Sequence, residues 1–161
     1  MVLGIGNPLG GDDAVGTYVV DLLNRALGTA CPRRRGIKPA IPAGITAMDA
    51  GTAPESYTSV IRRRRPDLLI LVDAADMGLA AGALRIIPAE NIRTLSFSTH
   101  SMPLSTFISY VESFCRKVLL VGIQPGQTET GAPVSQVVRQ SARKLTKTIL
   151  QGRWSNIPLL E

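Results

Sequence analysis

The sequence predicts an α/β fold of three layers, in which helices cover both faces of one largely parallel sheet. Two observations predict it. Apolar segments of strand length alternate along the chain with segments whose apolar residues recur every three or four positions. The strand-length segments are apolar at consecutive positions, which is typical of strands buried on both faces. Repeated alternation of this kind indicates an α/β/α domain, and no linker or repeat divides the 161 residues.

Five apolar segments have the length and composition of strands. They are residues 2–5, 45–48, 68–72, 83–87 and 118–123. The first strand ends where glycine, asparagine and proline cluster in the next few positions. The first two strands should be parallel and joined by a right-handed crossover. The third is apolar on both faces, so we expect it at the centre of the sheet.

The first two helices follow the first two strands. Apolar spacing predicts a helix over residues 13–27, which Gly28 would stop. Residues 29–44 contain three prolines and four cations, so we expect a surface loop there. Thr52 and the glutamate three positions later match a capping box, which predicts a helix over residues 54–64.

Two further helices are expected in the second half of the chain. One begins at Pro103 and has an apolar stripe made of Leu104, Phe107, Ile108, Val111 and Phe114. The last has apolar Val134, Val137, Val138, Leu145 and Ile149. Its outer face carries Arg139, Arg143, Lys144 and Lys147, with the cations toward the carboxyl end, as the helix dipole favours.

Composition argues against several classes of protein. The net charge is +6, and much of the excess lies in two runs, residues 33–38 and 62–65. Aromatic residues are only 4% and do not alternate with these cations, so a nucleic-acid surface is not expected. We interpret the runs as solvated faces, with a protein-docking patch as the alternative. Cys31 and Cys115 form no CxxC pair, so neither a zinc site nor a disulfide framework is expected.

Neither a membrane helix nor a secretory signal is expected from the sequence. No apolar run approaches the roughly 20 residues of a membrane helix, and the first residues carry no basic segment typical of a secretory signal. We therefore expect a cytoplasmic protein without membrane insertion.

Acidic side chains follow three of the predicted strands. Asp12 and Asp13 follow the first, Asp49 the second and Asp73 the third, while His100, the single histidine, precedes the third helix. Functional groups collect at the carboxyl ends of strands in such sheets. We therefore expect Asp13, Asp73 and His100 at one edge, as a mixed oxygen and nitrogen set suited to zinc, nickel or iron.

Each residue also has a structural interpretation. Asp12 or Asp13 could cap the first helix, Asp49 and Asp73 could be ordinary turn residues, and His100 could be solvent-exposed. Known nucleotide-binding loops and the serine-hydrolase elbow are absent from the sequence.

Five segments in one order resemble the nickel–iron hydrogenase maturation endopeptidases, specifically the branch that acts on hydrogenase-3-type (formate hydrogenlyase-like) enzymes. The segments are residues 4–13 (GIGNPLGGDD), 49–55 (DAGTAPE), 71–78 (LVDAADMG), 99–104 (THSMPL) and 122–125 (GIQP). Ala14 and Ala50 stand where the family often has glycine, and both are small-for-small changes.

The resemblance implies a single domain over residues 1–161 with a twisted, mostly parallel five-stranded sheet. It implies an aspartic-type endopeptidase that removes the C-terminal tail of the hydrogenase large-subunit precursor after nickel insertion. The site residues would be Asp13, Asp73 and His100, both as catalytic groups and as metal ligands. The nickel would be presented by the substrate, and zinc or cadmium could substitute for it in a crystal. A monomer is expected.

Four more residues are expected to support this site. They are Asp12, Asp49, Gly51 and Thr52. We expect Thr52 to cap the second helix and Asp49 to orient the site as a hydrogen-bond acceptor. Whether the metal is catalytic or only recognised stays open, because two carboxylates could also polarise a water as an aspartic dyad.

Two other functions are weighed against this one. Residues 4–8 also resemble the opening of peptidyl-tRNA hydrolases, which would make the protein an esterase, although such enzymes need an earlier histidine than His100. A non-enzymatic scaffold for hydrogenase assembly is the third possibility, because a fold alone does not settle a function.

Overall fold

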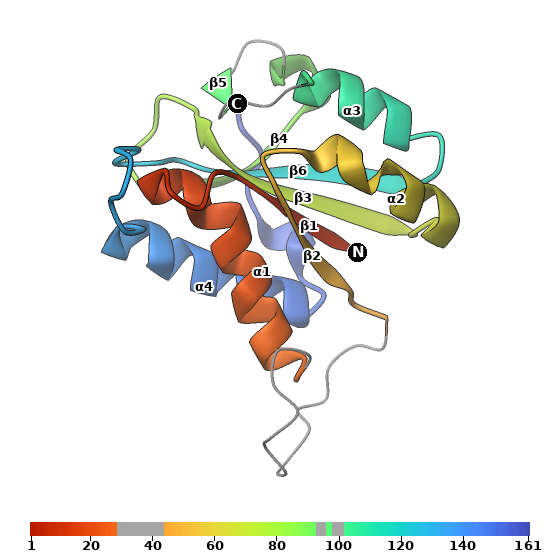
Figure 1. The fold of residues 1–161 in the computed structure, drawn as a ribbon, viewed down its shortest axis with the longest axis horizontal. Helices are drawn as coiled ribbons and strands as arrows, with labels where there is room; N and C mark the ends of the chain where they lie inside the picture. Colours follow the sequence, from red (N-terminus) through yellow and green to blue (C-terminus); the bar gives the residue numbers. More distant parts are fainter. Residues whose placement is uncertain (29–43, 93–95, 98–101) are drawn as a thin grey trace.

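The computed structural model describes residues 1–28, 44–92, 96–97 and 102–161. Its main sheet has the strand order β2-β1-β3-β6-β4 and is shown in Figure 1. The strands are β1 (Val2–Ile5), β2 (Ala47–Gly51), β3 (Leu68–Asp76), β4 (Leu84–Ile87) and β6 (Lys117–Ile123). All neighbours pair in parallel except β4, which is antiparallel to β6. The expected mostly parallel sheet is therefore confirmed.

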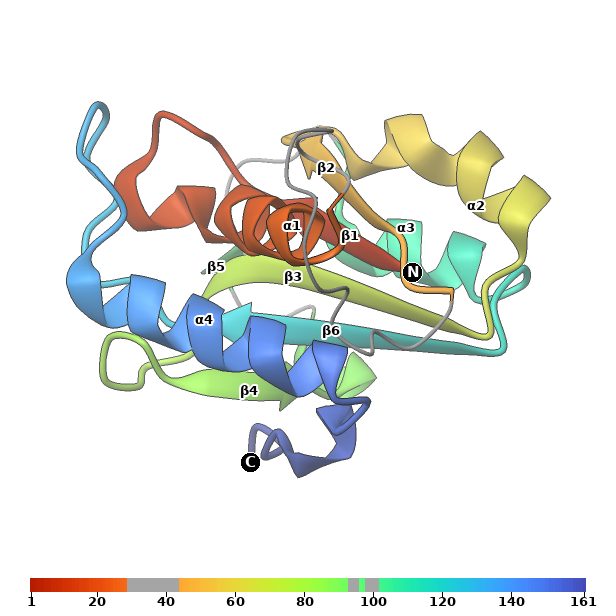
Figure 2. The same cartoon turned by 90° about the horizontal axis from the view of Figure 1, so that it is seen from below.

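Helices cover both faces of this sheet. Side chains of α1 (Val15–Ala26) and α4 (Gln136–Leu150) form one core with one face. Side chains of α2 (Thr58–Arg64) and α3 (Leu104–Val111) form a second core with the other face. Figure 2 shows α1 and α4 in front of the sheet and α3 behind it. The three predicted layers are thus confirmed.

The central strand β3 is longer than the apolar run that predicts it. The expected strand covers residues 68–72, whereas β3 runs over Leu68–Asp76. Its pairing with β6 continues in register as far as Ala74, and β5 (Ser96–Phe97) then pairs antiparallel with Ala75 and Asp76. These two partners keep the strand hydrogen-bonded after its neighbour β1 has ended.

The first helix crosses β1 at very short range. The chain forms a 3-10 turn, η1 (Gly11–Ala14), before α1 begins at Val15, so the expected helix over residues 13–27 starts too early. A methyl group on Gly16 would overlap the Ile5 carbonyl oxygen, and one on Gly4 would overlap the Gly16 carbonyl oxygen. Only glycine at both positions lets α1 pack directly onto the strand that leads to the candidate site.

The predicted cap of the second helix is wrong. The segment begins with a 3-10 turn, η2 (Pro54–Tyr57), whose N-cap is Ala53 and has no side-chain cap hydrogen bond. Thr52 lies one position too early for capping and is exposed. The α-helical part covers only Thr58–Arg64, because the first turn of the expected helix is wound more tightly.

The apolar stripes of the last two helices are partly correct. Leu104, Phe107, Ile108 and Val111 are buried, but Phe114 lies beyond the end of α3 and stacks edge-on against Tyr110. In α4, Val138, Leu145 and Ile149 are buried, whereas Val137 is 41% exposed. Val134 precedes the helix and packs partly buried against the core. The exposed Val137 shows that apolar identity alone does not determine which side of a helix meets the sheet.

The described arginine run at the end of α2 is solvent-exposed, as expected. Arg62, Arg63, Arg64 and Arg65 are all exposed, while the run at residues 33–38 and Cys31 lie outside the described residues. Within the part of the chain that the structure describes, no helix has the length and hydropathy required to cross a membrane.

Arg65 ends α2 in the left-handed conformation, with φ of 42° and ψ of 61°. A side chain in this region costs about 1–2 kcal/mol, part of which glycine recovers. Arg65→Gly is therefore expected to raise the free energy of unfolding by about 0.5–1 kcal/mol and the melting temperature by a few degrees. Thermal unfolding checks it against Arg63→Gly, a helical position where glycine should destabilise by about 1 kcal/mol. An equal loss for both variants would contradict the assignment of strain to Arg65.

Candidate active site

Asp13 lies in η1, directly after the loop that leaves β1. Its side chain is only 8% exposed, and its Oδ2 accepts a hydrogen bond from the Asn7 backbone N–H at 3.1 Å. The same loop is closed by the Gly10 N–H, which donates to the Asn7 carbonyl at 2.9 Å. The Asp13 carboxylate is therefore held by the loop rather than free in solvent. It caps no helix, because the N-caps of η1 and α1 are Gly10 and Ala14.

Asp73 lies within β3 rather than after it, which corrects the expected position. Its side chain is fully buried, and it is paired in register with Gly122 of β6. On the other side, the last β1 partner of β3 is Gly4, opposite Val72. Asp73 is thus next to the carboxyl end of β1 even though its own strand continues. The turn η1 contacts β3, so Asp13 and Asp73 come from adjoining elements.

The third predicted ligand, His100, lies outside the described residues. Among the residues that the structure does describe, no cluster of three or more histidine, cysteine, aspartate or glutamate side chains could hold a metal ion. The described part of the chain supplies two carboxylates, Asp13 and Asp73, from adjoining elements. Two oxygen donors fit part of a mixed oxygen and nitrogen metal site, and they leave its completion to other ligands.

Asp12 binds a part of the chain that is distant in the sequence. Its Oδ2 accepts hydrogen bonds from the backbone N–H groups of Gly126 at 2.8 Å and Gln127 at 3.0 Å. Ser135 donates its N–H to Oδ1 at 2.6 Å and its hydroxyl to Oδ2 at 3.0 Å. Burial raises the pKa of Asp12, but these donors together outweigh it and hold the pKa below the ordinary value. The side chain is therefore an anion at neutral pH, and its expected alternative as cap of the first helix is wrong.

Asp49 and Gly51 connect β2 to the same end of the sheet. Asp49 lies in β2, not after it, and its exposed carboxylate accepts hydrogen bonds from the Thr17 hydroxyl at 2.9 Å and the Gly51 N–H at 3.0 Å. The Gly51 carbonyl accepts from the Gly6 N–H at 2.8 Å. These contacts tie β2 to α1 and to the loop that carries Asp13. A supporting role of Asp49 and Gly51 in the reaction stays a prediction. Thr52 makes no capping bond.

Gln124 is a buried residue directly after β6 that is not among the site residues expected from the sequence. Its side-chain oxygen accepts from the N–H groups of Met77 at 2.7 Å and Leu79 at 3.2 Å, and its amide donates to Asp76 at 3.1 Å. This hydrogen bond, followed by one from the Gly78 N–H, lowers the pKa of Asp76. A glutamine directly after an apolar strand was the available signal, since a buried amide requires partners.

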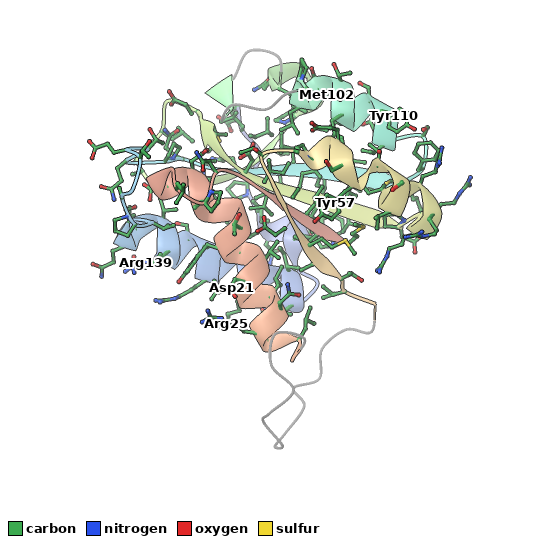
Figure 3. All side chains as sticks on the ribbon, in the orientation of Figure 1. Asp21, Arg25, Tyr57, Met102, Tyr110 and Arg139 are labelled. Atoms are coloured by element: carbon green, nitrogen blue, oxygen red, sulfur yellow. The ribbon has the colours of Figure 1, made fainter. Side chains whose placement is uncertain are left out.

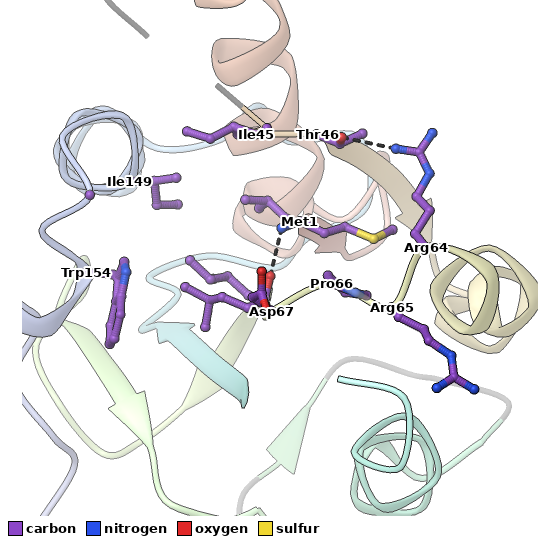
Figure 4. Close-up of a pocket in the computed structure, with 14 residues that line it drawn as sticks. Met1, Ile45, Thr46, Arg64, Arg65, Pro66, Asp67, Ile149 and Trp154 are labelled. Carbon is purple, nitrogen blue, oxygen red and sulfur yellow. Dashed lines mark hydrogen bonds between the residues drawn. The ribbon is translucent and has the colours of Figure 1, made fainter. Parts of the chain in front are cut away.

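Neither Asp13 nor Asp73 lines either of two pockets that the described residues form. One of about 310 Å³ lies between η2, α2 and α3 and includes Thr58, Met102 and Tyr110. Figure 3 labels Met102, just before α3, and Tyr110, within it. A larger one of about 520 Å³, shown in Figure 4, is lined by the starts of strands, including Met1 and Leu68. It lies at the amino-terminal edge of the sheet, away from Asp13 and Asp73.

Comparison with known proteins identifies the family. The model of the hydrogenase maturation proteases (HycI) matches residues 33–152. The chain belongs to this family. The hydrogenase 3 maturation protease of Escherichia coli K12 is 31% identical to this protease over 142 residues, which cover 88% of this chain and 82% of that protein.

Solved structures agree with this membership. The solution structure of the endopeptidase HycI from Escherichia coli has a TM-score of 0.80 and 30% identity, covering 100% of this chain and 96% of that one. The crystal structure of the [NiFe] hydrogenase maturation protease HycI from Thermococcus kodakarensis has a TM-score of 0.73 and 30% identity, with 94% and 90% coverage. The predicted family, fold and endopeptidase class are therefore confirmed over the esterase and scaffold alternatives.

Proposed function

We propose that this protease removes the C-terminal tail of a nickel–iron hydrogenase large-subunit precursor after nickel has been inserted. The observation that supports it is the position of two aspartates in a chain of this family. Asp13 lies in η1 and Asp73 lies in β3, and these two elements are in contact at one edge of the sheet. The reaction would take place in the cytoplasm, with the protease acting as a monomer. Its partner is the nickel-loaded precursor, and no nucleic acid takes part.

The residues of the proposed site have separate tasks. Asp13, Asp73 and His100 would contact the nickel that the precursor carries, completing its coordination and aligning the tail. A bound cation of this kind polarises a carbonyl and lowers the pKa of a coordinated water. Because the Asn7 N–H holds Oδ2 of Asp13, we assign Oδ1 to the substrate. The buried position of Asp73 excludes bulk water from its carboxylate and strengthens its interaction with a cation. The pair of carboxylates is the basis for an aspartic-type class.

The proposal is tested with purified protease and a nickel-loaded large-subunit precursor. Mass spectrometry of the intact precursor should show the loss of one discrete C-terminal peptide at a single site. A matched precursor that already lacks the tail should keep its mass. An unchanged length of a precursor whose nickel content has been verified would contradict the proposed function.

A further inference from the structure

The turn η1 is bonded to the loop that follows β6 by its backbone as well as by the Asp12 side chain. The Asp12 N–H donates to the Gln127 carbonyl at 2.8 Å, and the Gly131 N–H donates to the Leu9 carbonyl at 2.8 Å. Figures 1 and 2 both show this loop beside the turn. Gly11 adopts φ of +59°, and a methyl group on it would lie 2.8 Å from the Gln127 carbonyl oxygen. The two segments are therefore packed backbone to backbone.

The Asp12 carboxylate also lies at the amino end of α4. Its partner Ser135 is the N-cap residue of that helix. The Ser135 hydroxyl makes no cap hydrogen bond and donates to Asp12 instead. A glutamate often receives the N-cap N–H from within its own helix. Here the carboxylate that accepts the N–H of the N-cap residue belongs to Asp12, which lies 123 positions earlier in the chain. An anion at this end is further favoured by the helix dipole.

We propose that Asp12 is a positioning residue for the reaction: by fixing η1 against the loop after β6, it sets the orientation of the Asp13 carboxylate. The inference rests on the proposed function, in which Asp13 contacts the substrate. All four residues of η1 are buried, and the Asp13 N–H is bonded to Gly10 at 3.0 Å. A turn this short cannot shift at Asp12 without moving its neighbour.

The chemistry of the clamp requires a carboxylate. All four partners of Asp12 are donors, three backbone N–H groups and one hydroxyl. An asparagine of the same shape would have to direct its NH₂ group at one or more of these donors, which breaks those hydrogen bonds and places two donors face to face. Asp12→Asn thus removes the clamp with the smallest change in volume.

The test compares catalysis and local structure in Asp12→Asn. We expect kcat for tail removal to fall about 10- to 100-fold, the effect of a displacement of roughly 1 Å at a catalytic group, while KM stays within about twofold because substrate binding elsewhere is unchanged. Independently, amide exchange measured by NMR should show faster exchange of the Asn7 N–H, which reports the hydrogen bond to Asp13 Oδ2.

Two control variants separate positioning from a general loss of stability or charge. Leu145→Ala removes a fully buried side chain of α4 and should lower the melting temperature without changing kcat or Asn7 exchange below it. Asp21→Asn removes a carboxylate that pairs with Arg25 on α1. Figure 3 shows this pair away from η1, so the variant should change neither kcat nor Asn7 exchange. Where Asp12→Asn does not fold, Ser135→Ala removes one donor and should move both readouts in the same direction by less.

Wild-type kcat or wild-type Asn7 exchange in the folded variant would overturn the proposal, since Asp12 would then be purely structural. The Asn7 measurement needs no substrate. A wild-type protein that cleaved no precursor would contradict the proposed function, while Asn7 exchange would still decide whether Asp12 positions Asp13.

Discussion

Asp13→Asn and Asp73→Asn are each expected to reduce tail removal by about 100-fold or more while the fold stays intact. Asparagine keeps the shape of the side chain but removes the negative charge, and with it the attraction for a substrate cation in a partly or fully desolvated position. Both aspartates are buried, with 8% of Asp13 and 0% of Asp73 exposed, so bulk water cannot compensate for the lost negative charge. His100→Ala should have the same effect.

These variants are measured by mass spectrometry of the precursor and by circular dichroism of the protease. Asp49→Asn provides a graded comparison, because its exposed carboxylate accepts hydrogen bonds from Thr17 and Gly51 on the outer side of the sheet and should cost less activity. A folded Asp13 or Asp73 variant that processes the precursor at the wild-type rate would remove that residue from the site.

Nickel-free precursor is expected to remain uncleaved, even in excess free zinc. The proposed site has only three protein ligands, Asp13, Asp73 and His100, and a site with open positions should hold a free ion weakly. The cation should therefore arrive with the substrate. Protease that has been treated with a chelator and then freed of it should cleave nickel-loaded precursor normally.

A self-sufficient metalloprotease would give the opposite pattern. Chelation would inactivate it, and the nickel content of the precursor would make no difference. The four combinations of treated or untreated protease with loaded or nickel-free precursor are compared by mass spectrometry. Cleavage of the nickel-free form would refute recognition of the substrate's metal, although the endopeptidase class would stand.

Local patterns account for most of the fold. Consecutive apolar residues locate the strands, and helical periodicity locates α1, α3 and α4, because burial on one or both faces imposes these periods on the sequence itself. The boundaries are less accurate. The tight first turns η1 and η2 precede their helices, and apolar spacing does not distinguish a 3-10 turn from the start of an α-helix.

The candidate site was only partly available from the sequence. Acids near strand ends directed attention to Asp13 and Asp73, since carboxyl ends of parallel strands share an edge. The position of Asp73 inside β3 was not available, because it depends on β6 and β5 continuing beside that strand after β1 ends. The resemblance separated Asp13 as a ligand from Asp12 as a supporting residue, but it gave no contact of Asp12, because the partners of that side chain lie 114 to 123 positions later.

By itself, therefore, the sequence determined the three-layer class, the central strand and a short set of acids, all of which follow from periodicity and residue chemistry within a few positions. Only the tertiary structure decided what those acids contact. Asp12 binds donors 114 to 123 positions later in the chain, and Gln124 joins two strand ends 47 or more residues apart. Such partners come together only when the sheet and its helices assemble, and a buried polar group then forms hydrogen bonds with the groups that lie next to it in the folded chain.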